Sequence, residues 1–129
     1  MFDTPREAVT VLVVDDQPDV RELMSLQLRS LGYRVVEAEN GEEAVEAARK
    51  NCPALILMDV QMPVLDGLSA ARLIRSIKEL CRVIIVAFSA FGDGGNRERA
   101  LDAGCDDYVS KTEGVTRLRD ILMRHLPDC

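Results

Sequence analysis

The chain has 129 residues, of which 47% are hydrophobic and only 4% aromatic, and its 22 acidic and 16 basic residues give a formal net charge of −6. This length and apolar content fit one domain, residues 1–129, with an aliphatic core, and the acidic balance argues against direct binding of nucleic acid. No apolar run approaches the roughly 20 residues that cross a bilayer, and four cysteines without a CxxC pair favour a reducing, cytoplasmic location.

The first half of the chain alternates between strand and helix patterns. The run Val9–Val14 is almost continuously β-branched, which is typical of a strand buried on both faces. Pro18 favours the start of a helix at its own position. The more polar Tyr33–Ala38 predicts an edge strand, and Asn40 with Glu43 three residues later predicts a capped second helix.

The second half continues this alternation. Three further strands are predicted at Ala54–Met58, Val83–Ala87 and Tyr108–Val109. Apolar residues at helical spacing, such as Leu73 and Ile74, predict a helix after each of them. Five strands and five helices in alternation imply an α/β fold with a doubly wound parallel sheet. The polar second and fifth strands fit the edges, which gives the strand order 2-1-3-4-5.

Polar side chains with complementary chemistry follow four of the predicted strands. They are Asp15 and Asp16 after the first strand, Asp59 after the third, Ser89 after the fourth and Lys111 after the fifth. The carboxyl ends of parallel strands meet at one rim of a sheet, where ligands of α/β proteins bind. Three carboxylates, a hydroxyl and an ammonium suit a divalent cation and a phosphoryl group. A carboxylate such as Asp59 can attack phosphorus and form an aspartyl phosphate.

Each of these residues also has a structural interpretation. Asp15 and Asp16 could cap the following helix and favour its dipole. Ser89 could be a turn residue and Lys111 a surface lysine. The joint arrangement at four strand ends favours the functional interpretation over these.

Three other features are expected to be structural. Asp66 fits the N-cap of the third helix. His125, late in the last helix, is expected to face the helix dipole or solvent. The glycine-rich Gly92–Gly95 lacks the pattern GxxxxGK[ST], which argues against a Walker-type nucleotide loop.

Four segments of the chain closely resemble the receiver domain of two-component response regulators. They are VLVVDD at Val11–Asp16, LILMDVQMPVLDG at Leu55–Gly67, FSA at Phe88–Ala90 and AGCDDYVSK at Ala103–Lys111. These segments have the order and the spacing of the family, so the resemblance covers nearly the whole chain. It implies a flavodoxin-like three-layer sandwich with the strand order 2-1-3-4-5.

The resemblance also implies roles for the acids at the rim. Asp59 is the expected phosphoacceptor. Asp16 and Asp59 are the expected direct ligands of Mg²⁺, together with the backbone carbonyl of Gln61, and Asp15 is expected to hold the ion through water.

Three more positions match the family and two depart from it. Lys111 is expected to contact the phosphoryl group, Ser89 to be the switch hydroxyl and Tyr108 to be the aromatic side chain that moves with it. Thr112 stands where the family often has proline after the lysine. The bulky Phe91 lies two residues after the switch hydroxyl, and we expect it to slow hydrolysis of the phosphorylated form by crowding the approach of water.

The expected function is a phosphorylation-dependent signalling switch. A sensor histidine kinase or a histidine phosphotransfer protein would donate the phosphoryl group in a Mg²⁺-dependent reaction. The phosphorylated surface would then act on a downstream protein, a fused output domain or a second copy of the chain. The chain would catalyse only its own phosphorylation and dephosphorylation, without direct contact to nucleic acid or membrane. Both a stand-alone receiver and a piece of a longer regulator fit the sequence.

Two other functions stay open at this point. A haloacid-type aspartyl-phosphate hydrolase also uses a strand-end aspartate, but such enzymes show DxDx[TV] after the first strand, where this chain has Asp15-Asp16-Gln17-Pro18. A phosphate-independent adaptor with the same fold would not need the complete set of acids, hydroxyl and lysine. Binding of Mg²⁺ separates this adaptor from the switch.

Overall fold

The computed structural model describes residues 9–60, 66–80, 82–89, 96–110 and 118–126 of the chain. Its strands are β1 (Thr10–Val14), β2 (Arg34–Ala38), β3 (Leu55–Asp59), β4 (Ile84–Ser89) and β5 (Asp107–Ser110). Its helices are α1 (Pro18–Ser30), α2 (Gly41–Asn51), α3 (Gly67–Ser76), the short 3₁₀ helix η2 (Lys78–Leu80), α4 (Asn96–Asp102) and α6 (Leu118–His125). The strands form one parallel sheet in the order β2-β1-β3-β4-β5, which confirms the predicted topology.

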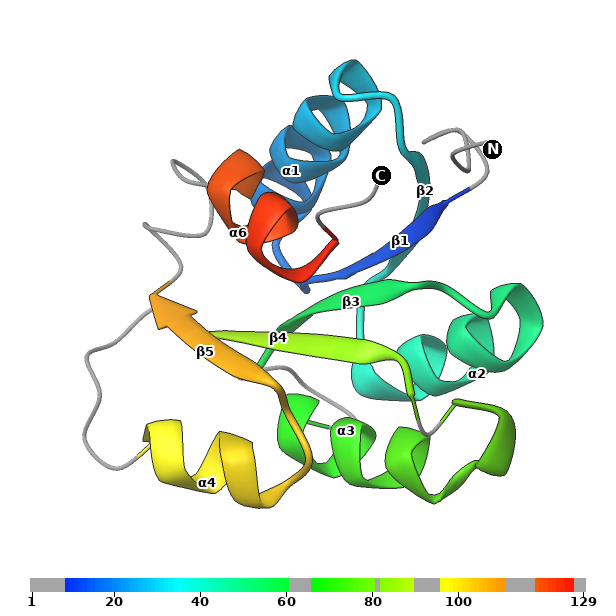
Figure 1. Cartoon of the computed structure of the whole chain (residues 1–129), viewed down its shortest axis with the longest axis vertical. Coiled ribbons are helices and arrows are strands. Elements are labelled where there is room, and N and C mark those ends of the chain that lie inside the picture. Colours follow the sequence, from blue (N-terminus) through cyan, green and yellow to red (C-terminus); the bar gives the residue numbers. More distant parts are fainter. Residues whose placement is uncertain (1–8, 61–65, 81, 90–95, 111–117, 127–129) are drawn as a thin grey trace.

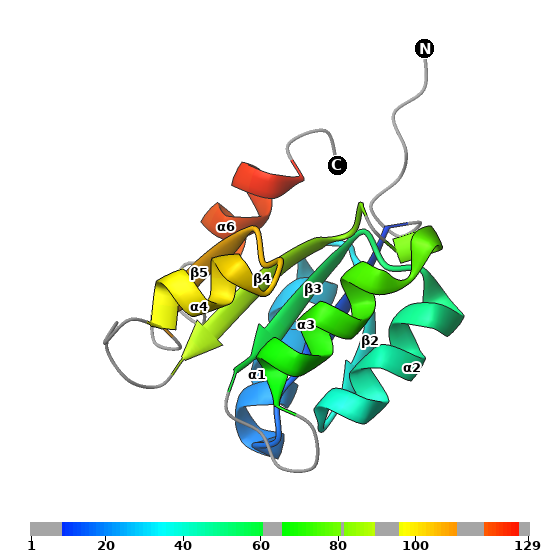
Figure 2. The ribbon, with the colours of Figure 1, turned by 90° about the horizontal axis from the view of Figure 1, so that it is seen from below.

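Helices cover both faces of this sheet and give the molecule three layers (Figure 1). α1 and α6 lie on one face. α2, α3 and α4 lie on the other, and Figure 2 shows the molecule from their side. Since every described strand is parallel to its neighbours, all carboxyl ends point to the same edge of the sheet.

The central strands are apolar throughout because both of their faces are covered. Successive side chains of a strand point to opposite faces. Val11 and Val13 therefore pack in the core under α1 and α6, whereas Leu12 and Val14 pack in the core under α2 and α3. All five residues of β3 are buried, including the polar Asp59.

The structure corrects some predicted element ends and one helix face. β3 and β4 extend through Asp59 and Ser89, so these residues end their strands rather than follow them. Leu73 has the spacing of a buried residue but is 47% exposed, because the buried stripe of α3 runs through Ala70 and Ile74 instead.

Both predicted helix caps are confirmed. Oδ1 of Asn40 accepts a hydrogen bond of 2.8 Å from the amide of Glu43, and Oδ1 of Asp66 accepts one of 2.9 Å from the amide of Ser69. The carboxylate of Glu43 also accepts a hydrogen bond of 3.0 Å from the amide of Glu39, the residue before the cap. Burial of Asp66 acts to raise its pKa, but hydrogen bonds from Ser69 and from nearby backbone amides together outweigh this and hold the pKa below its ordinary value.

Candidate functional site

Three predicted acids meet at the carboxyl ends of β1 and β3. These strands are neighbours, with Val14 opposite Met58, so the residues that close them share one edge of the sheet. Asp15, Asp16 and Asp59 each offer a carboxylate oxygen, and the three oxygens lie within 4.8 Å of one another. We call these residues the acid cluster. Asp15 and Asp59 are buried and Asp16 is exposed, so the cluster opens to solvent on one side.

The turn from β1 to α1 is fixed by hydrogen bonds from three directions. The amide of Asp15 donates to the carbonyl of Ala38 at the end of β2, at 3.1 Å. Oδ1 of Asp15 accepts from the amide of Gln17 at 2.8 Å, and its carbonyl accepts from Nη1 of Arg21 at 2.8 Å. The structural interpretation, in which Asp15 and Asp16 cap α1, is not confirmed, because the N-cap residue is Gln17 and no side chain caps the helix. One oxygen of Asp15 stabilises the turn before α1 instead, and its carboxylate belongs to the acid cluster.

A glycine allows the chain to return close to Asp59. Gly67, the first residue of α3, donates its amide to the carbonyl of Val60 at 3.3 Å. A Cβ atom at Gly67 would lie 2.1 Å from the carbonyl oxygen of Asp59 and 2.8 Å from Cα of Val60, well inside contact distance. The sequence indicates a helix cap at Asp66, but only the structure shows that the next residue, Gly67, lies against the main chain of Asp59.

The donor set of the acid cluster fits a hard divalent cation. Carboxylate oxygens are ligands that Mg²⁺ and Ca²⁺ prefer in proteins. Three negative charges at this distance repel one another, and burial of two of them strengthens the repulsion. A bound cation would remove this repulsion and attract an anionic group such as a phosphoryl group.

The backbone of Ser89 extends the same edge toward β5. The backbone of Ser89 ends β4 and lies opposite Ser110 of β5, and Lys111 is the next residue in the chain. The side chain of Ser89 is outside the described part of the structure. Gln61, Phe91, Lys111 and Thr112 also lie outside the described residues, so their predicted roles stay predictions.

Tyr108, the predicted switch aromatic, lies in β5 opposite Ala87 of β4. It is 6% exposed and belongs to the core on the side of α2, α3 and α4. Its hydroxyl is buried and makes no hydrogen bond to any described residue. Burial of a polar group without a partner costs free energy, so the inward position of Tyr108 stabilises the fold less than burial of an apolar side chain of the same size would.

His125 forms a contact that the sequence did not predict. Its Nε2 lies 3.0 Å from Oδ2 of Asp107 on β5, and Nη1 of Arg124 lies 3.2 Å from the same oxygen. Burial acts to raise the pKa of Asp107. The hydrogen bonds from His125 and from the amide of Tyr108, together with the nearby positive charges, lower the pKa by more than burial raises it, so it lies below its ordinary value. His125 lies in the last turn of α6, as the helix-dipole expectation requires. The expectation that it faces solvent is wrong, because its side chain is only 16% exposed and contacts β5.

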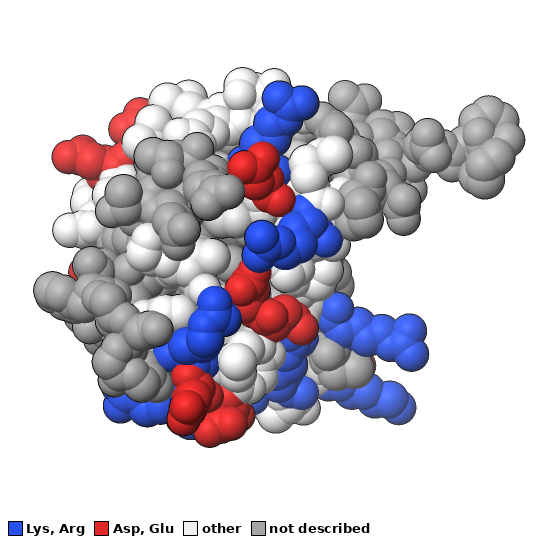
Figure 3. All heavy atoms as spheres, turned by 60° about the vertical axis from the view of Figure 1, so that its left-hand side comes forward, with Lys and Arg blue, Asp and Glu red and all other residues white. Residues whose placement is uncertain are grey.

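The described surface differs from the acid cluster in its charge pattern. On the face drawn in Figure 3, basic and acidic side chains alternate and neither sign forms a continuous area. None of the described helices is long and apolar enough to cross a membrane. The carboxyl ends of β1 and β3, where three acids lie together, differ in this respect from the face drawn in Figure 3.

Comparison with known proteins gives one consistent answer. A family model described as the response regulator receiver domain matches residues 11–123. A gliding motility regulatory protein of Myxococcus xanthus is 42% identical over 115 residues, which are 88% of this chain and 15% of that protein. The polar-differentiation response regulator DivK of Brucella anthropi is 33% identical over 92% of this chain and 97% of its own length.

A solved structure agrees in fold and in sequence. The receiver domain of the sensor histidine kinase PA1611 of Pseudomonas aeruginosa, which has a magnesium ion coordinated in its active-site cleft, matches with a TM-score of 0.84 at 40% identity. The match covers 92% of this chain and 98% of that domain. The chain spans from 14% to 47% of the length of several curated relatives that it matches. The family match over residues 11–123, together with the parallel sheet and its acid cluster, shows that the chain belongs to the response regulator receiver domain family.

Proposed function

We propose that this receiver accepts a phosphoryl group on Asp59 from the phosphohistidine of a sensor histidine kinase or a histidine phosphotransfer protein. The observation that carries the proposal is the convergence of the acid cluster from two neighbouring strand ends. In the transfer, a carboxylate oxygen of Asp59 forms a bond to phosphorus while the phosphorus–nitrogen bond of the donor breaks. The leaving imidazole keeps the electron pair of that bond.

Asp15, Asp16, Asp59 and the backbone carbonyl of Gln61 would hold Mg²⁺ in this proposal. The magnesium ion reported for the PA1611 receiver supports the assignment, as does the oxygen donor set of the acid cluster. When bound, Mg²⁺ supplies positive charge that neutralises the phosphoryl oxygens. The chain contributes the orientation of the carboxylates, which the turn at Asp15 and the close approach of Gly67 determine.

Lys111 and Ser89 would complete the phosphoryl site. The strand register supports this, since Asp59 lies opposite Phe88 and Ser89 lies opposite Ser110. We assign the ammonium of Lys111 to one phosphoryl oxygen and the hydroxyl of Ser89 to another. The two donors would stabilise the negative charge that the cation leaves uncompensated.

The signal would leave the site through Ser89 and Tyr108. The Ser89 hydroxyl would form a hydrogen bond to the phosphoryl group. The side chain of Tyr108 would then move toward the space that the Ser89 hydroxyl vacates. The buried Tyr108 hydroxyl, which has no partner among the described residues, supports such a movement. The surface of α4 and β5 beside Tyr108 would then exist in two states that a partner distinguishes.

The chain would catalyse only its own phosphorylation and the hydrolysis of its own aspartyl phosphate. Its output would reach a downstream protein, an output domain in the same polypeptide or a second copy of the chain. Direct binding of nucleic acid or membrane is not part of the proposal, and residues 1–129 form a single receiver domain in it.

Labelling with acetyl phosphate and Mg²⁺ tests the acceptor. Asp59→Asn removes the nucleophilic carboxylate at nearly constant volume, so it should abolish the mass increase of one phosphoryl group. Asp102→Asn is the matched control, because it makes the same chemical change at an exposed residue at the end of α4 that is not a member of the acid cluster. Labelling of Asp59→Asn at the yield of the control would contradict the proposal.

A further inference from the structure

Arg21 on α1 holds the main chain of the acid cluster. Its Nη1 donates to the carbonyl oxygen of Asp15 at 2.8 Å, and its Nε lies 3.1 Å from Oε1 of Glu37 on β2. The side chain is only 17% exposed. One planar guanidinium therefore joins the turn between β1 and α1 to the edge strand, with two donors in a fixed relative geometry.

The acid cluster needs such a restraint because its own charges oppose its geometry. Three carboxylates that repel one another would relax apart if the turn carrying Asp15 and Asp16 were free to move. A hydrogen bond from a charged donor to the Asp15 carbonyl resists this movement without occupying a carboxylate oxygen. Arg21 thus restrains the turn without itself contacting a carboxylate of the cluster in these bonds.

We propose that Arg21 is a positioning residue for the metal site: it fixes the main chain of Asp15 so that the carboxylates of the acid cluster converge before Mg²⁺ arrives. Glu37 orients the guanidinium in this arrangement. The inference rests on the proposed function, since it assumes that the cluster binds Mg²⁺. Nothing in the local sequence indicated it, because Arg21 and Glu37 are far apart in the chain.

Positioning and simple electrostatics predict opposite effects for loss of Arg21. Removal of a positive charge beside three carboxylates should by Coulomb's law strengthen the binding of a cation. Removal of a positioning residue should weaken it, because part of the binding energy must then bring the carboxylates together. The sign of the change in Mg²⁺ affinity therefore separates the two explanations.

Arg29 provides a matched control on the same helix. Its Nη2 lies 3.7 Å from Oε2 of Glu37, so it shares the carboxylate partner of Arg21 and carries the same charge. It is 52% exposed and lies eight residues farther along α1, about 12 Å from Arg21 along the helix axis and away from Asp15. Arg29→Ala thus makes the same change in charge without removing the bond to the turn.

Titration of Mg²⁺ by isothermal calorimetry at constant ionic strength tests the inference in the parent protein, Arg21→Ala, Arg21→Lys and Arg29→Ala. We expect Arg21→Ala to bind about tenfold more weakly than the parent, and Arg29→Ala to bind as tightly or slightly more tightly. Arg21→Lys keeps the charge and one donor but not the fork, so its affinity should lie between the parent and the alanine variant. If Arg21→Ala does not fold, an affinity of Arg21→Lys below that of the parent carries the same conclusion.

Hydrogen exchange without metal gives a second measurement. The amide of Gln17, which is bonded to Oδ1 of Asp15, should exchange faster in Arg21→Ala than in Arg29→Ala. Equal or tighter Mg²⁺ binding by Arg21→Ala than by Arg29→Ala would overturn the positioning role while the metal site itself stands. Absence of Mg²⁺ binding in the parent protein would instead contradict the proposed function and this inference together.

Discussion

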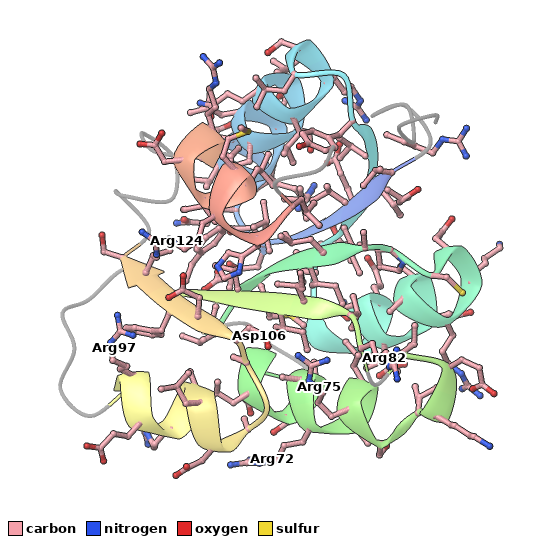
Figure 4. All side chains as sticks on the ribbon, in the orientation of Figure 1. Arg72, Arg75, Arg82, Arg97, Asp106 and Arg124 are labelled. Carbon is pink, nitrogen blue, oxygen red and sulfur yellow. The ribbon has the colours of Figure 1, made fainter. Side chains whose placement is uncertain are left out.

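The two ends of the sheet hold charged groups in different arrangements: like charges lie together at one end, and a positive charge lies among acceptors at the other. At the carboxyl ends of β1 and β3, the acid cluster gathers three like charges within 4.8 Å. At the amino ends of β4 and β5, the guanidinium of Arg75 on α3 is surrounded by acceptors: the carboxylate of Asp106 at 2.6 Å, the carbonyl of Gly104 at 2.7 Å and the carbonyl of Val83. Figure 4 shows Arg75 reaching from α3 toward the sheet beside Asp106.

This difference separates a stabilising end of the molecule from a functional one. We call Arg75 with these three acceptors the Arg75 cluster. Its positive charge is balanced within the protein by the carboxylate of Asp106 and the two carbonyl oxygens. Asp106 also accepts a hydrogen bond of 2.8 Å from the amide of Ile85. The acid cluster instead gathers three groups of the same charge, and a divalent cation would reduce the repulsion between them. We therefore expect substitutions at the Arg75 cluster to lower stability without affecting phosphorylation chemistry, and substitutions in the acid cluster to do the reverse.

The largest effect on stability is expected for Arg75→Ala. It leaves two backbone carbonyls and a carboxylate without their charged donor, and we expect the free energy of unfolding to fall by about 3 kcal/mol, about 1 kcal/mol for each lost hydrogen bond. Urea unfolding followed by circular dichroism measures the change. Arg72→Ala, which removes an exposed arginine of the same helix (Figure 4), should change stability by less than about 0.5 kcal/mol. Equal losses in the two variants would remove the distinction between the ends.

A pair of glycine substitutions compares the ends directly. Gly67→Ala places a Cβ atom against the carbonyl of Asp59, and Gly104→Ala places one 2.6 Å from Cγ of Arg75 at a residue with φ of 103°. Each should cost about 2 kcal/mol of stability. Only Gly67→Ala should also slow phosphorylation by acetyl phosphate under conditions in which both variants are folded, because only it displaces the acceptor. Equally slow phosphorylation in Gly104→Ala would contradict this.

Much of the fold followed from local patterns. The buried strands are nearly continuous apolar runs, and the caps at Asn40 and Asp66 act over three residues, so both were predictable from the sequence. Strand ends were less predictable, since Asp59 and Ser89 are polar residues that nevertheless pair with the neighbouring strand. The exposure of Leu73 depends on which stripe of α3 meets the sheet, and spacing alone does not decide that.

The site shows the same limit. The members of the acid cluster each adjoin an apolar strand, so their convergence could be predicted from the parallel sheet. Arg21 with Glu37 and His125 with Asp107 are pairs separated by at least sixteen residues, and no local pattern marks them. Contacts of this kind depend on the packing of helices on the sheet, which only the tertiary structure provides.

A smaller effect of opposite sign is expected for the acid cluster. Asp16→Ala removes one of three repelling charges, so the metal-free protein should gain about 1 kcal/mol of stability. The same variant should lose the increase in melting temperature that Mg²⁺ gives the parent protein. Asp19→Ala is the control, because Asp19 lies in the first turn of α1, where its charge favours the helix dipole. That control should lower stability slightly and keep the response to Mg²⁺; a loss of stability in metal-free Asp16→Ala would contradict the repulsion argument.

The smallest effect concerns Asp107 on the edge strand β5, which is a member of neither cluster. Its pKa lies below the ordinary value of 3.8, so the unfolded chain binds more protons than the folded protein below that pH. The stability that the ionised carboxylate contributes is therefore complete above pH 3.8 and is lost as the pH falls through the lowered pKa. Asp107→Asn should cost about 0.5 kcal/mol at higher pH, the usual worth of a partly exposed ion pair. This difference from the parent should shrink as the pH falls below 3.8 in a series of urea unfolding curves.

His125→Gln removes only one of the contacts that lower the pKa, so its difference from the parent should depend less on pH in the same range. A difference that stays constant into the acid range would show that the contact between α6 and β5 owes its stability to packing rather than to the charge of Asp107.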